Sequence, residues 1–294
     1  MERSICFFKF LILFLLICVQ PDIGHAKQKK VIYFGVIPRY NPVIMYQNYQ
    51  PIMDYLTQST SYRFELKLAR NYPEVVEHLR TGITQVASLG DVTFAAASHG
   101  FGAKPILRPK NSLGNPDYFS LIVVRKESPL TDVSQLIGKR FAFGNIHSTS
   151  GNLIPRLFLF KRGVSLSELK HYENLPTHTD VARAVLKGQY DAGAVKDVVA
   201  HRYEALGLRI LAQSEPIPAV PIAVRRNAPP ELVEAITTAL LAINPDDPNQ
   251  QDMLADWDPE FQNGFVETTT SDYLPILDML DSISEGCGTK CHPQ

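Results

Sequence analysis

The sequence predicts an α/β protein of two lobes, each a mostly parallel sheet flanked by helices. Three observations support this prediction. Segments typical of strands and helices alternate over the first ninety residues after position 26, which favours a mostly parallel sheet. Extended strands near residues 118 and 220 bracket a second β/α region. The length of 294 residues suits two domains rather than one, since a domain has roughly 100–200 residues.

The first 26 residues are typical of a secretory signal peptide. A basic start precedes an apolar run at 10–19, and Gly24-His25-Ala26 offers small residues for cleavage. The run is shorter than the ~20 residues of a membrane-spanning helix, which makes a retained anchor the lesser alternative. Ile17 stands before Cys18 where lipidation requires a small residue. We expect a soluble periplasmic protein cleaved near Ala26.

The composition excludes several classes of protein. Hydrophobic residues make up 45% of the chain, which is more than a disordered protein would have. The 29 Lys and Arg residues balance 30 Asp and Glu residues, so the strongly basic surface of a nucleic-acid-binding protein is not expected. Four cysteines are too few for a disulfide scaffold.

The elements of the first lobe are predicted from the spacing of apolar residues and from prolines and glycines at their ends. The run 31–37 is apolar, rich in β-formers and ends at Pro38, as a buried strand would. The helix expected at 73–79 begins with a proline in its first turn and is closed by Gly82. The other elements expected in this lobe are a helix at 48–56 and strands at 63–68 and 86–89.

The second region repeats the alternation. We expect strands at 118–125, 140–143, 191–195, 208–212 and 221–224, and helices at 128–136, 151–162, 180–187 and 229–243. The last of these helices is amphipathic. The predicted organisation is a signal peptide (1–26), a first part of lobe 1 (27–117), lobe 2 (118–216), a return to lobe 1 with C-terminal helices (217–286), and a cysteine-containing tail (287–294).

A polar loop carries the clearest functional signal. His147-Ser148-Thr149-Ser150-Gly151 lies between a predicted strand and a predicted helix. Hydroxyl groups and the free N–H groups of a helix start can together bind an anion, and the helix dipole adds to the attraction. The alternative is a serine that only caps the helix, but one hydroxyl would be enough for that. No Walker lysine follows, so the loop is not a nucleotide-binding P-loop.

Several stretches resemble, in order and spacing, the periplasmic phosphonate, phosphite and phosphate-binding proteins of ABC importers. The similarity covers residues 31–285. The matching stretches are Phe34-Gly35-Val36, Asn71-Tyr72, Asp117-Tyr118-Phe119-Ser120, Ser148-Thr149-Ser150-Gly151 with Pro155, Thr177-His178-Thr179-Asp180, Gly188-Gln189-Tyr190-Asp191-Ala192-Gly193, and Ile217-Pro218 before Pro221. The resemblance implies the type II solute-binding fold, whose two lobes close over a ligand.

The resemblance also implies which residues bind the ligand. The first-rank candidates are the hydroxyl clamp and three residues that reach the head group: Ser148, Thr149, Ser150, Tyr72, Tyr118 and His178. Taken without the resemblance, the two tyrosines could be packing residues and the histidine could cap a helix. The second-rank candidates are His147, Gly151 and Asp197.

Departures from the family pattern bear on the ligand. Members that bind aminophosphonates place carboxylates against the amine, but Val220 fills one such place and Asp197 is one residue off the other. A buried ammonium without an anionic partner is costly, so phosphate, phosphite or a small alkylphosphonate is favoured. An ionised Asp91 near the cleft would prefer a protonated ligand.

The C-terminal tail contains Cys287, Cys291 and His292. Three residues separate the cysteines, one more than in the usual haem c attachment motif, and the required histidine follows. The alternatives are a disulfide in an oxidising compartment and a metal-binding tail. We expect ligand binding to require no cofactor, and haem c would be a separate covalent group on the tail.

We expect a monomeric binding protein that delivers a small oxyanion to an ABC permease. A sensory or redox binding protein of the same fold, serving a sensor kinase or electron carrier, is the first alternative. A hydrolase that uses Ser148 or Ser150 with His178 is the second, although no nucleophile elbow is present. No catalytic residue and no metal site are therefore predicted.

Overall fold

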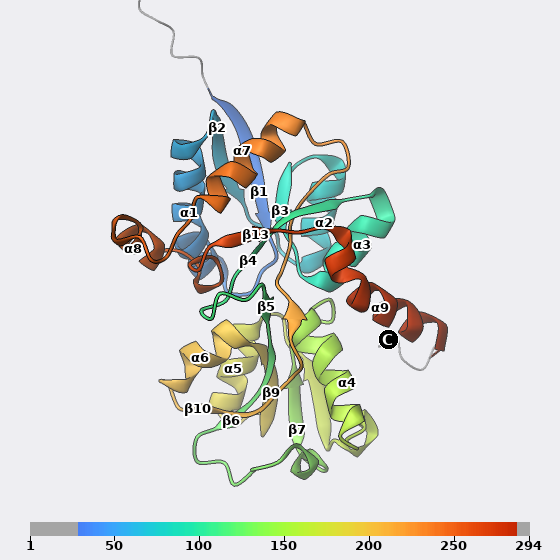
Figure 1. Ribbon diagram of the computed structural model, residues 1–294. Coiled ribbons are helices and arrows are strands. Elements are labelled where there is room, and N and C mark those ends of the chain that lie inside the picture. The colour runs from blue at the N-terminus through green and yellow to red at the C-terminus, as the bar shows by residue number, and fades with distance from the viewer. Residues whose placement is uncertain (1–28, 287–294) are drawn as a thin grey trace, which may run out of the picture.

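A computed structural model of the chain describes residues 29–286 and consists of two lobes joined by a narrow waist (Figure 1). The predicted signal peptide and the tail residues Cys287, Cys291 and His292 lie outside the described residues. No helix within 29–286 is long and apolar enough to cross a membrane.

Lobe 1 is built on a six-stranded sheet of order β13-β4-β12-β3-β1-β2. Its strands are β1 (Lys30–Val36), β2 (Tyr62–Lys67), β3 (Val86–Ser88), β4 (Lys104–Pro109), β12 (Ile222–Val224) and β13 (Phe265–Glu267). β1 pairs in parallel with β2 and β3, whereas β12 and β13 pair antiparallel with their neighbours. The expected α/β class is confirmed, but the sheet is mixed because strands from the returning part of the chain enter it in the opposite direction.

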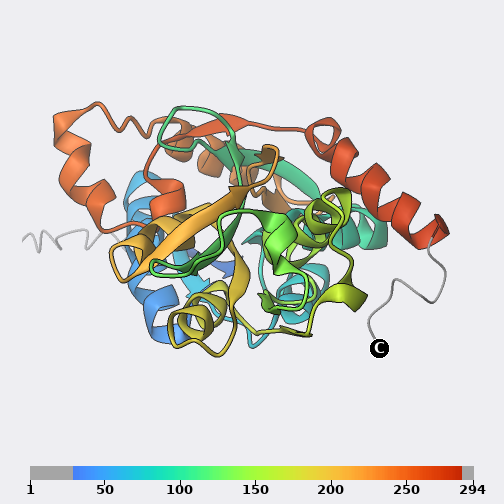
Figure 2. The same cartoon turned by 90° about the horizontal axis from the view of Figure 1, so that it is seen from below.

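Helices cover both faces of this sheet. They are α1 (Pro42–Ser59), α2 (Tyr72–Thr81), α3 (Asp91–Phe101), α7 (Pro230–Leu241), α8 (Pro248–Ala255) and α9 (Leu274–Gly286). α1 and α7 lie on one face and α2 and α3 on the other (Figure 1), while α8 and α9 project at opposite ends of the molecule (Figure 2). α2 begins at its Asn71 cap and ends at Gly82, whose φ of 80° requires the left-handed region.

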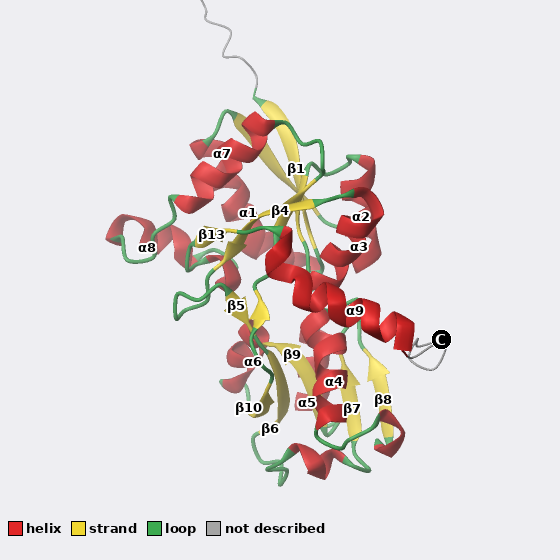
Figure 3. Ribbon diagram, turned by 45° about the vertical axis from the view of Figure 1, so that its right-hand side comes forward, coloured by secondary structure: helices red, strands yellow, loops and turns green. Residues whose placement is uncertain are grey.

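Lobe 2 is a five-stranded sheet of order β10-β6-β9-β7-β8, again with helices on its faces (Figure 3). Its strands are β6 (Ser120–Arg125), β7 (Arg140–Phe143), β8 (His171–Asn174), β9 (Ala192–Lys196) and β10 (Leu208–Gln213), and its helices are α4 (Ile154–Lys161), α5 (His178–Leu186) and α6 (Asp197–Glu204). β7 pairs in parallel with β8 and β9, while β6 runs antiparallel to β9 and β10. Four of its five strands therefore run in the same direction, and only β6 is reversed.

The chain passes between the lobes along two strands that lie side by side. β5 (Asp117–Tyr118) pairs antiparallel with β11 (Ile217–Pro218), and Tyr118 is opposite Ile217. The carboxyl ends of β1 and β3 in lobe 1 and of β7 and β9 in lobe 2 point toward this waist. Ligands bind at the carboxyl ends of strands in such sheets, so the fold places the site between the lobes.

Candidate anion-binding site

The Ser-Thr-Ser loop begins the helix that follows β7, and its first turn is wider than an α-helical turn. A single π-helical turn spans Thr149–Leu153, and the Ser148 hydroxyl accepts a hydrogen bond from the Gly151 N–H at 3.0 Å. Ser148 is thus the cap considered as an alternative in the sequence. It also belongs to a buried row of hydroxyl residues, because Ser148, Thr149 and Ser150 are all nearly inaccessible to solvent.

Gly151 shapes the loop by having no side chain. A Cβ atom there would lie 2.9 Å from both the His178 Cε1 and the Ser148 Oγ, and 3.0 Å from the Gly144 Cα. The Gly144 N–H donates to the Gly151 carbonyl at 2.7 Å, so the two glycines form a close backbone contact. Gly151, ranked second from the sequence, therefore allows close packing of the loop.

The loop of lobe 2 meets the start of a helix in lobe 1. The Val92 N–H, in the first turn of α3, donates to the Thr149 Oγ at 3.1 Å. Gly90 is the cap of α3 and gives no side-chain hydrogen bond to it. The start of α3 and the Ser-Thr-Ser turn therefore face each other, and N–H groups at helix starts favour negative charge.

His178 is buried and uncharged. The Lys196 N–H donates to the His178 Nδ1 at 3.1 Å, so the imidazole carries its proton on Nε2. Nε2 lies 3.4 Å from the Ser148 hydroxyl. Burial, with the nearby charges of Lys196 and Arg39, lowers the pKa of His178 to about 3. The ring thus presents a neutral N–H donor to the loop.

The two predicted tyrosines are both buried. Burial raises the pKa of Tyr72 to about 12, and its hydroxyl is in hydrogen-bond contact with Ser148. The Tyr118 hydroxyl donates to the Asp91 Oδ2 at 3.0 Å. Burial raises the pKa of Asp91 to about 7. Burial also raises the pKa of Tyr118 well above its usual value, so both phenols stay protonated at neutral pH.

These side chains enclose one small pocket between the lobes. Its lining includes all six first-rank residues predicted from the sequence: Ser148, Thr149, Ser150, Tyr72, Tyr118 and His178, together with Ile37, Arg39, Gly90, Lys196 and Val220. The enclosed space is about 10 Å³, roughly what one water molecule needs, so the lobes must separate to admit a tetrahedral anion.

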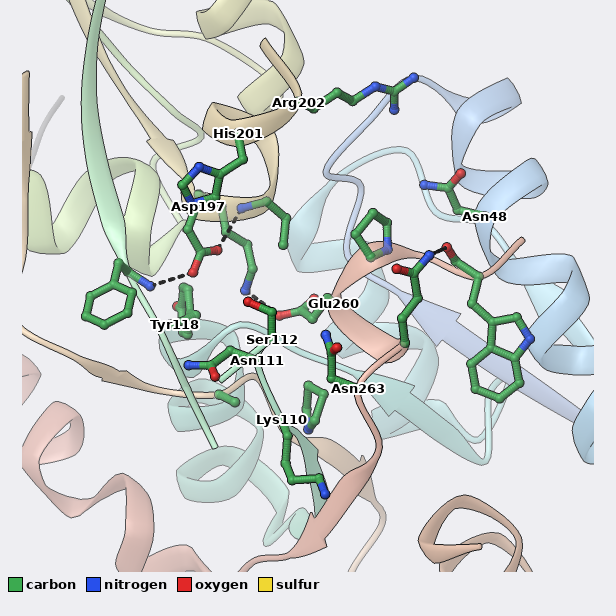
Figure 4. Close-up of a pocket in the computed structure, with 18 of the residues that line it drawn as sticks. Asn48, Lys110, Asn111, Ser112, Tyr118, Asp197, His201, Arg202, Glu260 and Asn263 are labelled. Carbon is green, nitrogen blue, oxygen red and sulfur yellow. Dashed lines mark hydrogen bonds and ion pairs between the residues drawn. The ribbon is translucent and has the colours of Figure 1, made fainter. Parts of the chain in front are cut away.

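The other two second-rank residues lie elsewhere. His147 is exposed and does not line the pocket. Asp197 lines a larger neighbouring pocket of about 990 Å³ (Figure 4), where it accepts hydrogen bonds from the N–H groups of Phe119 and Val198 at 3.0 and 2.8 Å. Neither side chain completes the anion pocket.

Two cations at the pocket were missed in the sequence. Arg39 donates to the Tyr49 Oη at 2.7 Å and forms an ion pair with Glu260, and the Lys196 Nζ lies 3.4 Å from the centre of the Tyr118 ring. Both follow or end a strand predicted from the sequence, at the carboxyl end where ligands bind. That position was the available signal. The pairing of both cations with Glu260 could not be recognised from the sequence, because Glu260 lies more than 60 residues from either of them.

The described residues contain no cluster of three or more His, Cys, Asp or Glu side chains suited to a metal ion. The donors at the pocket are instead hydroxyl, amide, imidazole, guanidinium and ammonium groups. Such donors match the oxygens of an anion.

The sequence of the chain is similar to those of known periplasmic binding proteins. A family model described as "ABC transporter, phosphonate, periplasmic substrate-binding protein" matches residues 34–273. The chain is 24% identical over 216 residues to a phosphonates-binding periplasmic protein of Escherichia coli, covering 69% of this chain and 64% of that protein. It is 26% identical over 187 residues to a probable phosphite-binding protein of Prochlorococcus marinus, covering 58% and 59%. The matched part is thus less than two thirds of either relative.

Solved structures show the same fold. The methylphosphonate complex of PhnD1 from Prochlorococcus marinus superposes with a TM-score of 0.76 at 18% identity, covering 87% of this chain and 99% of that one. A binding protein of a phosphonate transporter from Pseudomonas aeruginosa gives a TM-score of 0.75 at 22% identity, covering 89% and 91%. These likenesses confirm the predicted two-lobed binding-protein fold. Because the family model matches residues 34–273, which is most of this chain, the chain belongs to the family of periplasmic phosphonate substrate-binding proteins of ABC transporters.

Proposed function

We propose that this protein captures a small phosphorus oxyanion between its lobes and delivers it to an ABC permease. The observation that carries the proposal is the convergence of donors from both lobes on one pocket. Lobe 2 supplies the Ser-Thr-Ser turn and the His178 N–H, and lobe 1 supplies Tyr72 and the start of α3. Closure of the lobes would bring these groups onto the ligand oxygens together.

The class of ligand is a tetrahedral phosphorus oxyanion. Curated relatives are named for phosphonate, phosphite and phosphate, which supports the class without choosing a member. Val220, a buried apolar residue, lines the pocket, and the ammonium of Lys196 stands at its edge. An aminoalkyl group there would meet an apolar wall and a like charge. Phosphate, phosphite or a small alkylphosphonate is favoured for this reason.

The geometry at His178 favours binding over hydrolysis. A serine hydrolase needs an imidazole with a free lone pair facing the nucleophile. Here the lone pair of Nδ1 accepts the Lys196 N–H, and Nε2 carries the proton that faces Ser148. The imidazole is thus a donor to the pocket.

The remaining features of the proposal concern the setting of the protein. We propose export to the periplasm with cleavage near Ala26, a monomeric state and oxyanion binding that needs no cofactor. For the tail, disulfide, haem c and metal binding stay open. A Soret band after co-expression with a haem-maturation system, lost on Cys291→Ala, would identify haem, and its absence would leave the other two.

Calorimetry on the protein without its first 26 residues tests the proposal. Phosphate, phosphite, methylphosphonate and sulfate are titrated separately at one pH and ionic strength. We expect saturable binding of one ligand per protein for at least one phosphorus oxyanion, and weaker binding of sulfate. Failure of all three phosphorus oxyanions to bind would refute the proposed ligand class.

A further inference from the structure

Lys196 ends β9 at the waist and contributes to the pocket through both its backbone and its side chain. Its N–H fixes the proton of His178 on Nε2. Its ammonium lies over the Tyr118 ring at 3.4 Å and forms an ion pair with Glu260 across the lobes. The side chain is only 3% exposed, so this charge has been withdrawn from water.

Glu260 is shared between two cations. One carboxylate oxygen pairs with Arg39 and the other with Lys196. Arg39 has further partners, because Asp258 lies 3.8 Å away and Tyr49 accepts a hydrogen bond from it. If Lys196 moved away, Glu260 would therefore keep a buried counter-charge, which is the condition for an inexpensive exchange of partners.

Lys196 also stands between the two pockets. It and Tyr118 are the residues that line both the small anion pocket and the larger pocket of about 990 Å³ (Figure 4). The Lys196 side chain pairs with Glu260, and both residues line the larger pocket. A small swing of the ammonium about its flexible stem would turn it from Glu260 toward the anion pocket.

We propose that Lys196 is a ligand-binding residue that exchanges Glu260 for the bound oxyanion, while Glu260 stays paired with Arg39. The inference rests on the proposed function, since it requires a phosphorus oxyanion in the small pocket. Glu260 is then a competitor of the ligand for the Lys196 ammonium. A purely structural ion pair would instead hold the lobes together whatever is bound.

The proposed exchange predicts that substitution of Lys196 weakens ligand binding and substitution of Glu260 strengthens it. A purely structural ion pair predicts no such opposite effects on affinity. Calorimetry with methylphosphonate, or with the phosphorus oxyanion that binds wild-type protein most tightly, is done on Lys196→Met and Glu260→Gln. We expect Lys196→Met to weaken binding about tenfold to a hundredfold, as loss of a charge-assisted hydrogen bond does. Glu260→Gln should strengthen binding several-fold because it frees Lys196. Lys110→Met, in the larger pocket only, is the matched control and should bind as wild type.

The outcomes separate this inference from the proposed function. Wild-type protein that binds no phosphorus oxyanion would refute both. Wild-type binding with unchanged affinity in Lys196→Met, or weakened binding in both variants to the same extent, would refute the inference alone. If Glu260→Gln does not fold, the ¹⁵N signal of the Lys196 ammonium in wild-type protein, assigned by its loss in Lys196→Met, replaces it. That signal should shift on titration with the ligand, and a constant signal would contradict the exchange.

Discussion

The backbone N–H of Lys196 donates to the Nδ1 of His178 at 3.1 Å, and this contact fixes the chemistry of the imidazole. The ring is held neutral with its proton on Nε2, toward Ser148, so it donates to the pocket instead of accepting from it. A neutral donor suits a site that already holds two cations, because a third buried charge would be costly. In the proposed function, His178 would thus donate to the anion without itself being charged.

The buried neutral state of His178 makes folding stability depend on pH. Its pKa is about 3 in the folded protein and about 6.5 when unfolded, so between these values the unfolded chain binds one proton more. This group therefore makes the free energy of unfolding rise with pH, by about 1.4 kcal/mol per pH unit at most. In His178→Gln we expect the slope between pH 4.5 and 6 to fall by about that amount, as measured by urea unfolding. An unchanged slope would show that the histidine is charged in the folded state.

Asp91 should make the free energy of unfolding fall with rising pH, which is the opposite of the effect of His178. Burial raises its pKa from 3.8 to about 7, so between these values the folded protein binds one proton more. This stabilisation is present at low pH and is lost as pH rises toward 7. Asp91→Asn should therefore raise the slope of unfolding free energy against pH by about 1.4 kcal/mol per unit between pH 4.5 and 6. A lower slope in this variant would contradict the assignment of a protonated, buried carboxyl group.

Gly151→Ala tests the close packing of the loop. The added methyl group would lie 2.9 Å from His178 Cε1 and from Ser148 Oγ, so the loop must shift. We expect a loss of about 1–3 kcal/mol in unfolding free energy, together with weaker ligand binding. Gly100→Ala, also in a helix but with no atom within 4 Å of the added Cβ, is the control and should be neutral or stabilising by up to about 1 kcal/mol. Equal effects of the two substitutions would contradict the packing argument.

The Val220 wall and the Lys196 ammonium lead to a ranking of ligands. 2-Aminoethylphosphonate should bind about tenfold or more weakly than methylphosphonate, because its ammonium meets a like charge and an apolar residue. Asp197 is occupied by two backbone N–H groups and lies in the larger pocket. Competition calorimetry measures the ranking directly. Tighter binding of the aminophosphonate would show that Asp197 or Glu260 does accept the amine.

The predictable part of the fold had local signals. The apolar run of β1, the caps of α2 and the hydroxyl run at 148–150 could each be recognised from neighbouring residues. α3 was missed because its residues are mostly small and apolar while its buried positions include the polar Asp91 and Thr93, so it has no amphipathic period. β8 was missed because it is a short, polar edge strand whose residues are mostly exposed.

The site could be predicted only in part for a related reason. The family resemblance supplied Tyr72, Tyr118 and His178 because their sequence surroundings match, and the structure brings them together. Arg39, Lys196 and Glu260 meet only after the lobes are placed, since Arg39 and Glu260 are 221 residues apart. A contact between buried charges so distant in sequence has no local pattern. The reversed strands β6, β12 and β13 likewise had no local signal, because the direction of a strand depends on how the chain passes between the lobes.

If the buried hydroxyl turn binds the phosphorus oxyanion, removal of its serine hydroxyls must weaken binding strongly, and calorimetry on two variants measures this effect. Ser148→Ala/Ser150→Ala removes two hydroxyls from the pocket, while His147→Ala changes the exposed neighbour. Circular dichroism first checks that both are folded, since loss of the Ser148 cap costs about 0.5–2 kcal/mol. We predict that the double variant loses about a hundredfold or more in affinity for the best phosphorus oxyanion and that His147→Ala binds as wild type. Unchanged affinity in the folded double variant would contradict the account.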